Sequence, residues 1–282
     1  MRAYLFMMLV GLSVVFSSCG DDEPYVKPLN KLTKITCVKN EHTPLFTVDI
    51  AYTPEGEISS IQMNQSETWQ FVRVQHVLNV IGDPSVVRTD YAYSGNVIVN
   101  KSVWQKNIYD PTAEYTSDVY SYRYNHNKLA YADLKMKWPK EGGKGYSEMN
   151  YPQDEKYDWD NNGNMISFTK DKRVMAYQYE SSMTRPVNFP FFVCGTFDPT
   201  QFDSFSPLNF SMGTLSRNMP TSAYSYTIPE VNQKQVEYTF EYIATLSDYL
   251  TGMIIREVRH EANGDVKNVY AYTFEYNFEP AS

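Results

Sequence analysis

Hydrophobic and polar residues alternate along most of the chain from about Leu32 onward. Between residues 235 and 242, every even position holds an aromatic or aliphatic residue and every odd position a polar one. Residues 270–278 again place an aromatic side chain at each even position. A period of two residues is typical of half-buried strands in antiparallel sheets. We therefore predict that each of two sets shares one buried face: Val236, Tyr238, Phe240 and Tyr242, and Tyr270, Tyr272, Phe274, Tyr276 and Phe278.

Turn signals rich in glycine and asparagine separate these runs. Such residues accept the positive φ angles that tight hairpin turns require. Each signal lies between two alternating runs, so neighbours in sequence should be neighbours in an antiparallel meander. The strand from Val266 to Phe278, for example, should be central and pair with Met253–His260 through Asn263-Gly264. The other signals are Pro54-Glu55-Gly56, Ser94-Gly95-Asn96, Asn125-His126-Asn127 and Asn161-Asn162-Gly163.

Residues 186–222 interrupt the alternation with a segment rich in proline and phenylalanine. Proline at this density is incompatible with central strands, because it cannot donate a ladder hydrogen bond. The phenylalanines indicate that the segment is buried. We interpret it as an irregular insertion packed against one mouth or face of the sheet.

The N-terminus is typical of a lipoprotein signal. Arg2 supplies a positive charge, and the apolar run from Ala3 to Phe16 is too short for a bilayer-spanning helix. Phe16-Ser17-Ser18-Cys19 resembles a bacterial lipobox, in which the cysteine is lipid-modified and becomes the new N-terminus. We assign residues 1–18 to the signal peptide and predict lipidation at Cys19. Ordinary secretory cleavage that leaves Cys19 free is the alternative.

Residues 19–31 form an acidic, proline-containing tether. The run Gly20-Asp21-Asp22-Glu23-Pro24 resembles the export signal of surface lipoproteins in Bacteroides-type bacteria. This resemblance implies an outer-membrane location, with the protein anchored through Cys19 and facing the cell exterior. Residues 32–282 are assigned to a single antiparallel β domain.

Composition narrows the class of protein further. The 282 residues carry a formal net charge of −8, which argues against nucleic acid because phosphate neutralisation requires a basic face. The 24 tyrosines favour half-buried pleated surfaces and so an all-β fold. Apart from Cys19, the chain has Cys37 and Cys194, which either form a disulfide in an oxidising compartment or remain two buried thiols.

Several pieces of the sequence together resemble a known family. They are the acidic-tailed lipoprotein signal, residues 122–129 (YRYNHNKL), residues 157–164 (YDWDNNGN) and the end of the insertion at Asn218-Met219-Pro220. They resemble the Bacteroides-type lipoprotein family of unknown function with a porin-like fold. The resemblance implies a large antiparallel sheet that curls towards an open or partly closed barrel. It implies no established activity, so no catalytic residue is carried over.

Candidate catalytic and metal-binding motifs are weak. Asp158-x-Asp160-x-Asn162-Gly163 begins like a calcium loop, but its twelfth position is Thr169 and an Asn-Gly turn explains the same residues. His260-Glu261 lacks the second histidine of a zinc-protease motif, and residues 141–145 (EGGKG) lack the P-loop spacing. We therefore expect no catalytic residue, cofactor or metal site, although two suitably spaced carboxylates could still form a glycosidase site.

Three functions remain open for a non-catalytic protein of this kind. The first is a structural or envelope-interaction role. The second is capture of a glycan or peptide by exposed aromatic side chains, with the four tryptophans as candidates: Trp69, Trp104, Trp138 and Trp159. The third is carriage of an apolar ligand inside the curled sheet.

The tyrosine pairs help to distinguish these functions. We expect the Tyr-x-Tyr runs to point inwards, because large rings fill a concave side efficiently. We expect Glu237, Glu241, Lys267 and Glu275 to point outwards, and the 186–222 segment to fill the interior completely. A remaining cavity would instead favour a ligand carrier. The Tyr-x-Tyr runs are Tyr91/Tyr93, Tyr120/Tyr122/Tyr124, Tyr177/Tyr179 and Tyr224/Tyr226.

Overall fold

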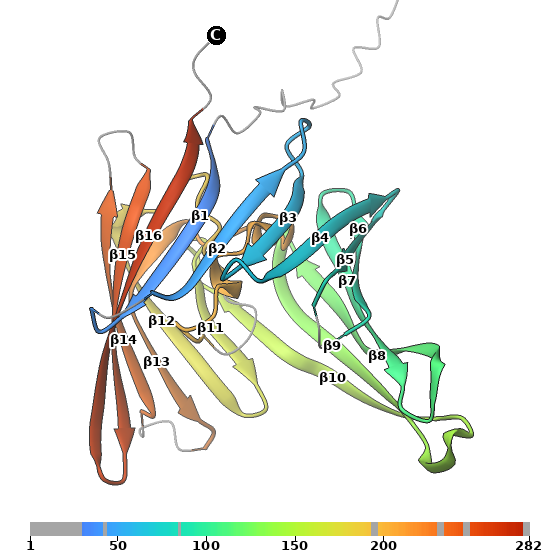
Figure 1. The fold of residues 1–282 in the computed structure, drawn as a ribbon. Coiled ribbons are helices and arrows are strands. Elements are labelled where there is room, and N and C mark those ends of the chain that lie inside the picture. Colours follow the sequence, from blue (N-terminus) through green and yellow to red (C-terminus); the bar gives the residue numbers. More distant parts are fainter. Residues whose placement is uncertain are drawn as a thin grey trace, which may run out of the picture.

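The computed structural model describes residues 30–41, 44–83, 86–192, 197–229, 234–244 and 249–278. Within these residues the chain forms sixteen antiparallel strands in a closed barrel, together with three short 3-10 helices (Figure 1). The predicted all-β antiparallel meander is thereby confirmed. The signal peptide, Cys19 and Cys194 lie outside the described residues, so the interpretations of them stay predictions.

Consecutive strands pair with one another throughout the barrel. The predicted hairpin is present, because β15 pairs with β16 along their length up to Glu261 and Gly264 at the turn. The strands are β1 (Asn30–Lys39), β2 (Pro44–Tyr52), β3 (Ile58–Met63), β4 (Glu67–Val74), β5 (Val77–Ile81), β6 (Arg88–Ser94), β7 (Val97–Asn107), β8 (Asp110–Asn125), β9 (Lys128–Pro139), β10 (Tyr146–Trp159), β11 (Met165–Lys170), β12 (Arg173–Thr184), β13 (Asn218–Thr227), β14 (Val236–Ala244), β15 (Leu250–Glu261) and β16 (Gly264–Phe278).

The seam between β1 and β16 closes the barrel. It runs from the pair of Asn30 with Phe278 to the pair of Lys39 with Tyr270. Pairing at Asn30 also starts the barrel two residues before the predicted boundary at residue 32. Closure removes both free edges that an open meander of this length would expose.

A plug formed by residues 185–192 and 197–217 fills much of the lumen. A barrel of sixteen strands is wide enough to leave an aqueous channel, so side chains of the wall alone cannot fill it. The plug connects β12 to β13 and contains η2 (Asp203–Phe205) and η3 (Pro207–Ser211). Its phenylalanine rings contact strands in different parts of the wall, for example Phe189 with Phe274 on β16 at 4.9 Å and Phe192 with Tyr157 on β10 at 5.9 Å between ring centroids.

The irregular segment is shorter than the sequence predicts. It ends at residue 217 and not at residue 222, because β13 already begins at Asn218. Pro220 lies inside this strand, opposite Tyr179, where the register between β12 and β13 shifts on both sides of the pair. The irregular pairing accommodates a residue that has no amide hydrogen to donate.

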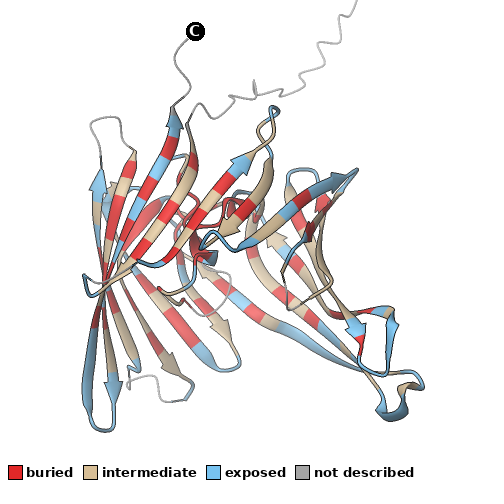
Figure 2. Ribbon diagram, in the orientation of Figure 1, coloured by how far each residue is buried: buried red, intermediate tan, exposed pale blue. Residues whose placement is uncertain are grey.

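The inner face of the wall is apolar and aromatic. Buried and exposed residues alternate along most strands (Figure 2). As predicted, Tyr238 and Phe240 on β14 and the tyrosines of β16 lie on the buried face. One of the Tyr-x-Tyr runs was predicted wrongly, however. Tyr224 and Tyr226 lie on the outer face, since it is Ala223 that stands opposite the inward-facing Tyr238.

The outer face of the wall is largely polar and carries ion pairs between neighbouring strands, although Val72, Val74 and Ile243 are exposed on it. Lys34 on β1 lies 4.0 Å from Glu275 on β16, and Arg256 on β15 lies 2.9 Å from Glu241 on β14. A bilayer-spanning barrel has the opposite polarity, with an apolar band facing lipid and a polar interior. The outer wall of the described barrel is therefore suited to contact with water. No helix in the described part of the chain is long and apolar enough to cross a membrane.

Candidate functional site

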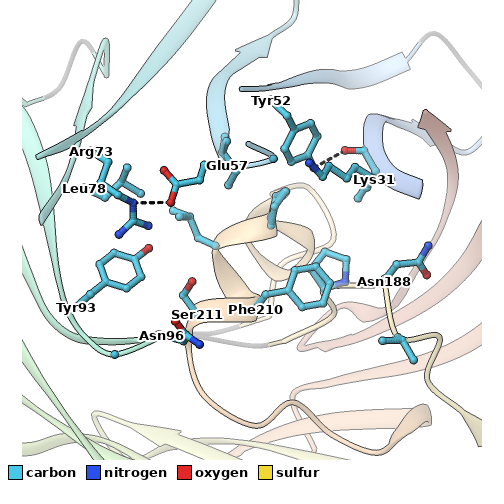
Figure 3. Close-up of a pocket in the computed structure, with 18 residues that line it drawn as sticks. Lys31, Tyr52, Glu57, Arg73, Leu78, Tyr93, Asn96, Asn188, Phe210 and Ser211 are labelled. Atoms are coloured by element: carbon cyan, nitrogen blue, oxygen red, sulfur yellow. Dashed lines mark hydrogen bonds and ion pairs between the residues drawn. The ribbon is translucent and has the colours of Figure 1, made fainter. Parts of the chain in front are cut away.

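A cavity of about 500 Å³ opens at the mouth where β1 begins and β16 ends (Figure 3). On one side it is bounded by the wall from β1 to β6, and on the other by the plug. The β2–β3 turn contributes Gly56 and Glu57, and the β6–β7 turn contributes Gly95 and Asn96. We call this space the mouth cavity.

The body of the mouth cavity is apolar. Leu32, Ile58 and Leu78 line it from the wall, while the plug supplies a further apolar set: Val187, Pro190, Pro207, Leu208 and Phe210. Val187 is 89 % exposed, so it lies at the open rim. An apolar molecule that enters would remove these side chains from water, which is the main driving force for binding in such sites.

Charged side chains lie around the apolar body. Arg73 Nε lies 2.8 Å from a carboxylate oxygen of Glu57, and the Arg73 guanidinium lies 4.5 Å from the centroid of the Tyr93 ring. Lys31 Nζ lies 4.9 Å from the centroid of the Tyr52 ring. These contacts hold both cations over aromatic faces. Two cations and one carboxylate give this cavity a net positive lining.

The Tyr52 ring is fixed by its own hydroxyl group. The hydroxyl donates to the main-chain oxygen of Leu32 at 2.7 Å. Burial raises the pKa of Tyr52 well above its ordinary value, so the phenol remains neutral. Tyr52 therefore presents a rigid, uncharged ring to the mouth cavity.

Two further cavities lie deeper, between the plug and the wall. One of about 290 Å³ faces β3 to β8, and it shares Leu208 with the mouth cavity. The other, of about 390 Å³, faces β11 to β15 and is lined by Arg173, Arg259, Asp198 and Gln201 among others. The expectation of a completely filled interior is therefore wrong. The plug is an irregular chain, and its rings do not match every contour of so wide a lumen.

A buried carboxylate organises the wall beside the 390 Å³ cavity. Glu257 accepts hydrogen bonds from Asn268 at 2.7 Å and from the Tyr270 hydroxyl at 3.1 Å, and it lies 2.7 Å from Arg259. Burial alone would raise its pKa, but these hydrogen bonds outweigh burial and the pKa lies below its ordinary value. Glu257 is therefore ionised at neutral pH, and it holds Arg259 against the wall.

The structure does not bring the four candidate tryptophans together. Trp69 faces the lumen, where its ring contacts Phe202, whereas Trp104 lies beneath the Arg88 guanidinium. Trp159 donates through Nε1 to the main-chain oxygen of Leu129. Trp138, 40 % exposed, lies near the end of β9. A row of exposed coplanar tryptophans, as a glycan platform would need, is not formed by these four residues.

The calcium-like segment is used to build a turn. Asp160 Oδ1 accepts from the amides of Asn162 at 2.9 Å and Asn164 at 2.7 Å. Asp158 accepts from the Ser167 hydroxyl and pairs with Lys156. No group of three potential metal ligands is found among the described residues.

Two other residues from the sequence analysis have structural partners. His260 lies between Asp265 at 2.9 Å and Glu237 at 3.0 Å on the outer surface. Cys37 is a free, buried thiol whose Sγ lies 3.7 Å from the main-chain oxygen of Pro199 in the plug.

Sequence reasoning missed the charged residues of the lumen. The signal was nevertheless present, because a period of two places Arg73 on the same face as Trp69 and Phe71. In the same way, Glu257 shares a face with Ile255. A charged residue on an otherwise apolar face of a strand indicates either a buried ion pair or a binding site.

These features define a class of protein: a wide antiparallel barrel with a polar outer wall and a lumen occupied by a segment of its own chain. The chain belongs to the family described as domain of unknown function DUF5032, whose model matches residues 19–280. A search of curated proteins finds no match.

Two solved structures have a similar fold, and both are described as porin-like proteins. The one from Bacteroides uniformis is 12 % identical, with a TM-score of 0.57 over 86 % of this chain and 98 % of its own. The one from Bacteroides vulgatus is 10 % identical, with a TM-score of 0.55 over 89 % of this chain and all of its own. At these identities the similarity establishes the barrel fold alone.

Proposed function

We propose that this protein is a non-catalytic binding protein of the bacterial envelope, anchored in the outer membrane by lipid on Cys19 and facing the cell exterior. The barrel itself stands in water, and its mouth cavity binds a small amphiphile. The observation that carries the proposal is the 500 Å³ space left between the plug and the wall. Of the functions left open by the sequence, this cavity favours carriage of an apolar ligand.

The lining of the mouth cavity defines the class of ligand. Its volume lies within the roughly 300–1,000 Å³ typical of small-molecule sites. The apolar body requires an apolar ligand, while Lys31 and Arg73 at its edge favour an anionic end. Glu57 already neutralises part of the Arg73 charge, so a single carboxylate suits the site better than a more highly charged group. A medium-chain fatty acid has these properties.

The position of the mouth cavity agrees with such a ligand. Lys31 and Leu32 line it, so it opens at the end of the barrel where β1 begins. Cys19 precedes Asn30 by eleven residues, which span at most about 40 Å when fully extended. A lipid on Cys19 would therefore keep this mouth close to the membrane surface, where amphiphiles concentrate.

Titration calorimetry with decanoate tests the binding proposal. Val187→Trp places a bulky ring at the rim of the mouth cavity and should weaken binding at least tenfold. Val266→Trp is the matched control, because Val266 is also exposed but lies on β16 outside the lining, and it should bind as the wild type does. Undetectable binding of decanoate by the wild type, or equal binding by the two variants, would favour the purely structural role.

Membrane fractionation tests the anchoring proposal separately. Cys19→Ala should leave the barrel folded but shift it from the membrane fraction to the soluble fraction of the envelope. An unchanged membrane fraction would refute lipid anchoring at this cysteine.

A further inference from the structure

The 290 Å³ cavity forms a second compartment, which we call the inner cavity. The wall from β3 to β8 lines one side of it, and plug residues from Phe202 to Met212 line the other. Leu208 borders both the inner cavity and the mouth cavity. The plug therefore separates two spaces whose linings differ in chemistry.

The inner cavity carries two opposite charges that do not neutralise each other directly. Lys101 projects from β7, and Asp203 belongs to η2 of the plug. Neither side chain has a hydrogen bond or an ion pair with any described residue. Lys101 Nζ lies 5.6 Å from the centroid of the Tyr120 ring.

The two charges are nevertheless close enough to affect each other. The pKa of Lys101 is raised, first by Tyr91 and also by Asp203 and Glu155, against the opposing effect of burial. Burial raises the pKa of Asp203, and Lys101 opposes that rise. The gap between them is therefore wider than an ion pair but narrow enough for Coulomb interaction.

Lys101 is half-buried, so protein replaces part of the hydration of its ammonium group. Asp203 remains exposed to the cavity, so its carboxylate can be reached by a molecule inside it.

Aromatic side chains make up most of the remaining lining. They come from both wall and plug: Trp69, Phe71, Tyr91, Tyr122 and Phe202. Trp69 Nε1 is buried without a hydrogen-bond partner, so the inner cavity also borders an unused donor. Such a lining binds an apolar or aromatic group well but offers nothing to a second charged group.

We propose that the inner cavity binds a zwitterion of the α-amino acid class with an apolar side chain. Its carboxylate pairs with Lys101, its ammonium group pairs with Asp203, and its side chain packs among the aromatic rings. A simple anion would leave Asp203 unpaired, and a metal cation would be repelled by Lys101. Asp83 at the edge of the cavity adds negative charge that favours the ammonium end.

Calorimetry with L-phenylalanine, two analogues and one neutral control tests the site. N-acetyl-L-phenylalanine lacks the ammonium group, L-phenylalaninamide lacks the carboxylate, and glucose is a neutral control. The wild type should bind L-phenylalanine at least tenfold more tightly than any analogue. Equal binding of the zwitterion and the two singly charged analogues, or no binding of L-phenylalanine at millimolar concentration, would overturn the proposal.

Two variants identify the roles of the charges. Lys101→Met should abolish the preference for L-phenylalanine over its amide, and Asp203→Asn should abolish the preference over the N-acetyl derivative. Both should fold normally, since neither side chain forms a hydrogen bond or an ion pair with a described residue; circular dichroism and the melting temperature check this. Lys135→Met is the matched control, because Lys135 pairs with Glu148 away from this cavity. Unchanged preferences in both variants would also overturn the proposal.

The test of the inner cavity does not depend on whether the mouth cavity binds decanoate. Val187→Trp should leave L-phenylalanine binding unchanged while it weakens decanoate binding, and Lys101→Met should have the opposite pattern. Failure of one site therefore does not imply failure of the other.

Discussion

Arg185 and Ser216 join the two ends of the plug: the Arg185 guanidinium donates through Nε to the main-chain oxygen of Ser216 at 3.0 Å. Through Nη1 the same side chain donates to the carbonyls of Pro186 and Phe189. Burial lowers the pKa of Arg185 to about 10, so it is still charged at neutral pH. The Arg185 side chain thus joins the first and the last residues of the plug.

Arg185→Met should therefore destabilise the protein by about 2–4 kcal/mol, because three carbonyl acceptors lose a charged donor and methionine replaces none of these bonds. Urea unfolding followed by tryptophan fluorescence measures the change. Arg256→Met is the control, since Arg256 forms an exposed pair with Glu241, and its midpoint should barely move. Equal shifts of the urea midpoint in the two variants would show that Arg185 does not stabilise the junction between the two ends of the plug.

Glu257 should make stability depend on acid pH. Its pKa is lower in the folded state than in the unfolded state, so its contribution is complete above the unfolded pKa of about 4.5 and is lost as pH falls through the folded value. Glu257→Gln should cost about 1–3 kcal/mol at pH 7, because Asn268 and Tyr270 lose a charged acceptor, while Arg259 is 42 % exposed and keeps its contact with water. Urea midpoints between pH 3 and pH 7 test this, and the variant should show a smaller loss on acidification than the wild type.

His260 should act in the opposite pH range. Hydrogen bonds to Asp265 and then Glu237 raise its pKa above the ordinary value. Its stabilising contribution is therefore complete below pH 6.5 and is lost as pH rises through the higher folded pKa. NMR titration of the imidazole should give a higher pKa in the wild type than in Asp265→Asn. The same value in both proteins would contradict the assigned contact.

Cys37 should be chemically inert in the native protein. Burial raises the pKa of its thiol to about 11, so almost no thiolate exists at pH 8. Iodoacetamide followed by peptide mass spectrometry should leave Cys37 unmodified in buffer and modify it in urea. Failure to label in urea without reductant, with labelling restored by dithiothreitol, would reveal the disulfide that the sequence left open.

The strands could be predicted because their signal is local. Period-two alternation depends only on which face of each strand is buried, and the structure has the expected faces at Val236–Tyr242 and Tyr270–Tyr276. Closure could not be predicted in the same way. The side chains of β1 and β16 alternate identically whether the two strands pair or remain edges, since pairing uses main-chain groups that every residue carries.

The wrong prediction for Tyr224 and Tyr226, that both face inwards, also has a physical cause that is not local in sequence. Tyrosine suits either face of a sheet, because its ring is apolar and its hydroxyl tolerates water. Small residues take the inward positions of β13, where Ala223 stands opposite Tyr238 and that ring already packs on Phe197 of the plug. The choice of face depended on a contact with a segment distant in sequence.

The site was still harder to predict. Arg73 and Lys101 are recognisable as charged residues within alternating strands, but the carboxylates that face them, Glu57 and Asp203, come from a turn and from the plug. The 3-10 helix that carries Asp203 has no periodic signal. Only the register of eight or more strands brings these groups to the cavities that they line.

The seam between β1 and β16 differs from the other ladders of the barrel only in that no segment between residues 30 and 278 connects its two strands directly. Asn30 stands directly opposite Phe278, so residues 30–278 begin and end side by side. A short linker between these positions, with new termini opened at the Asn263-Gly264 turn, would preserve every pair of strands. Because the barrel is closed, its strand pairs do not depend on which strand begins the chain. A circularly permuted gene should therefore encode the same barrel.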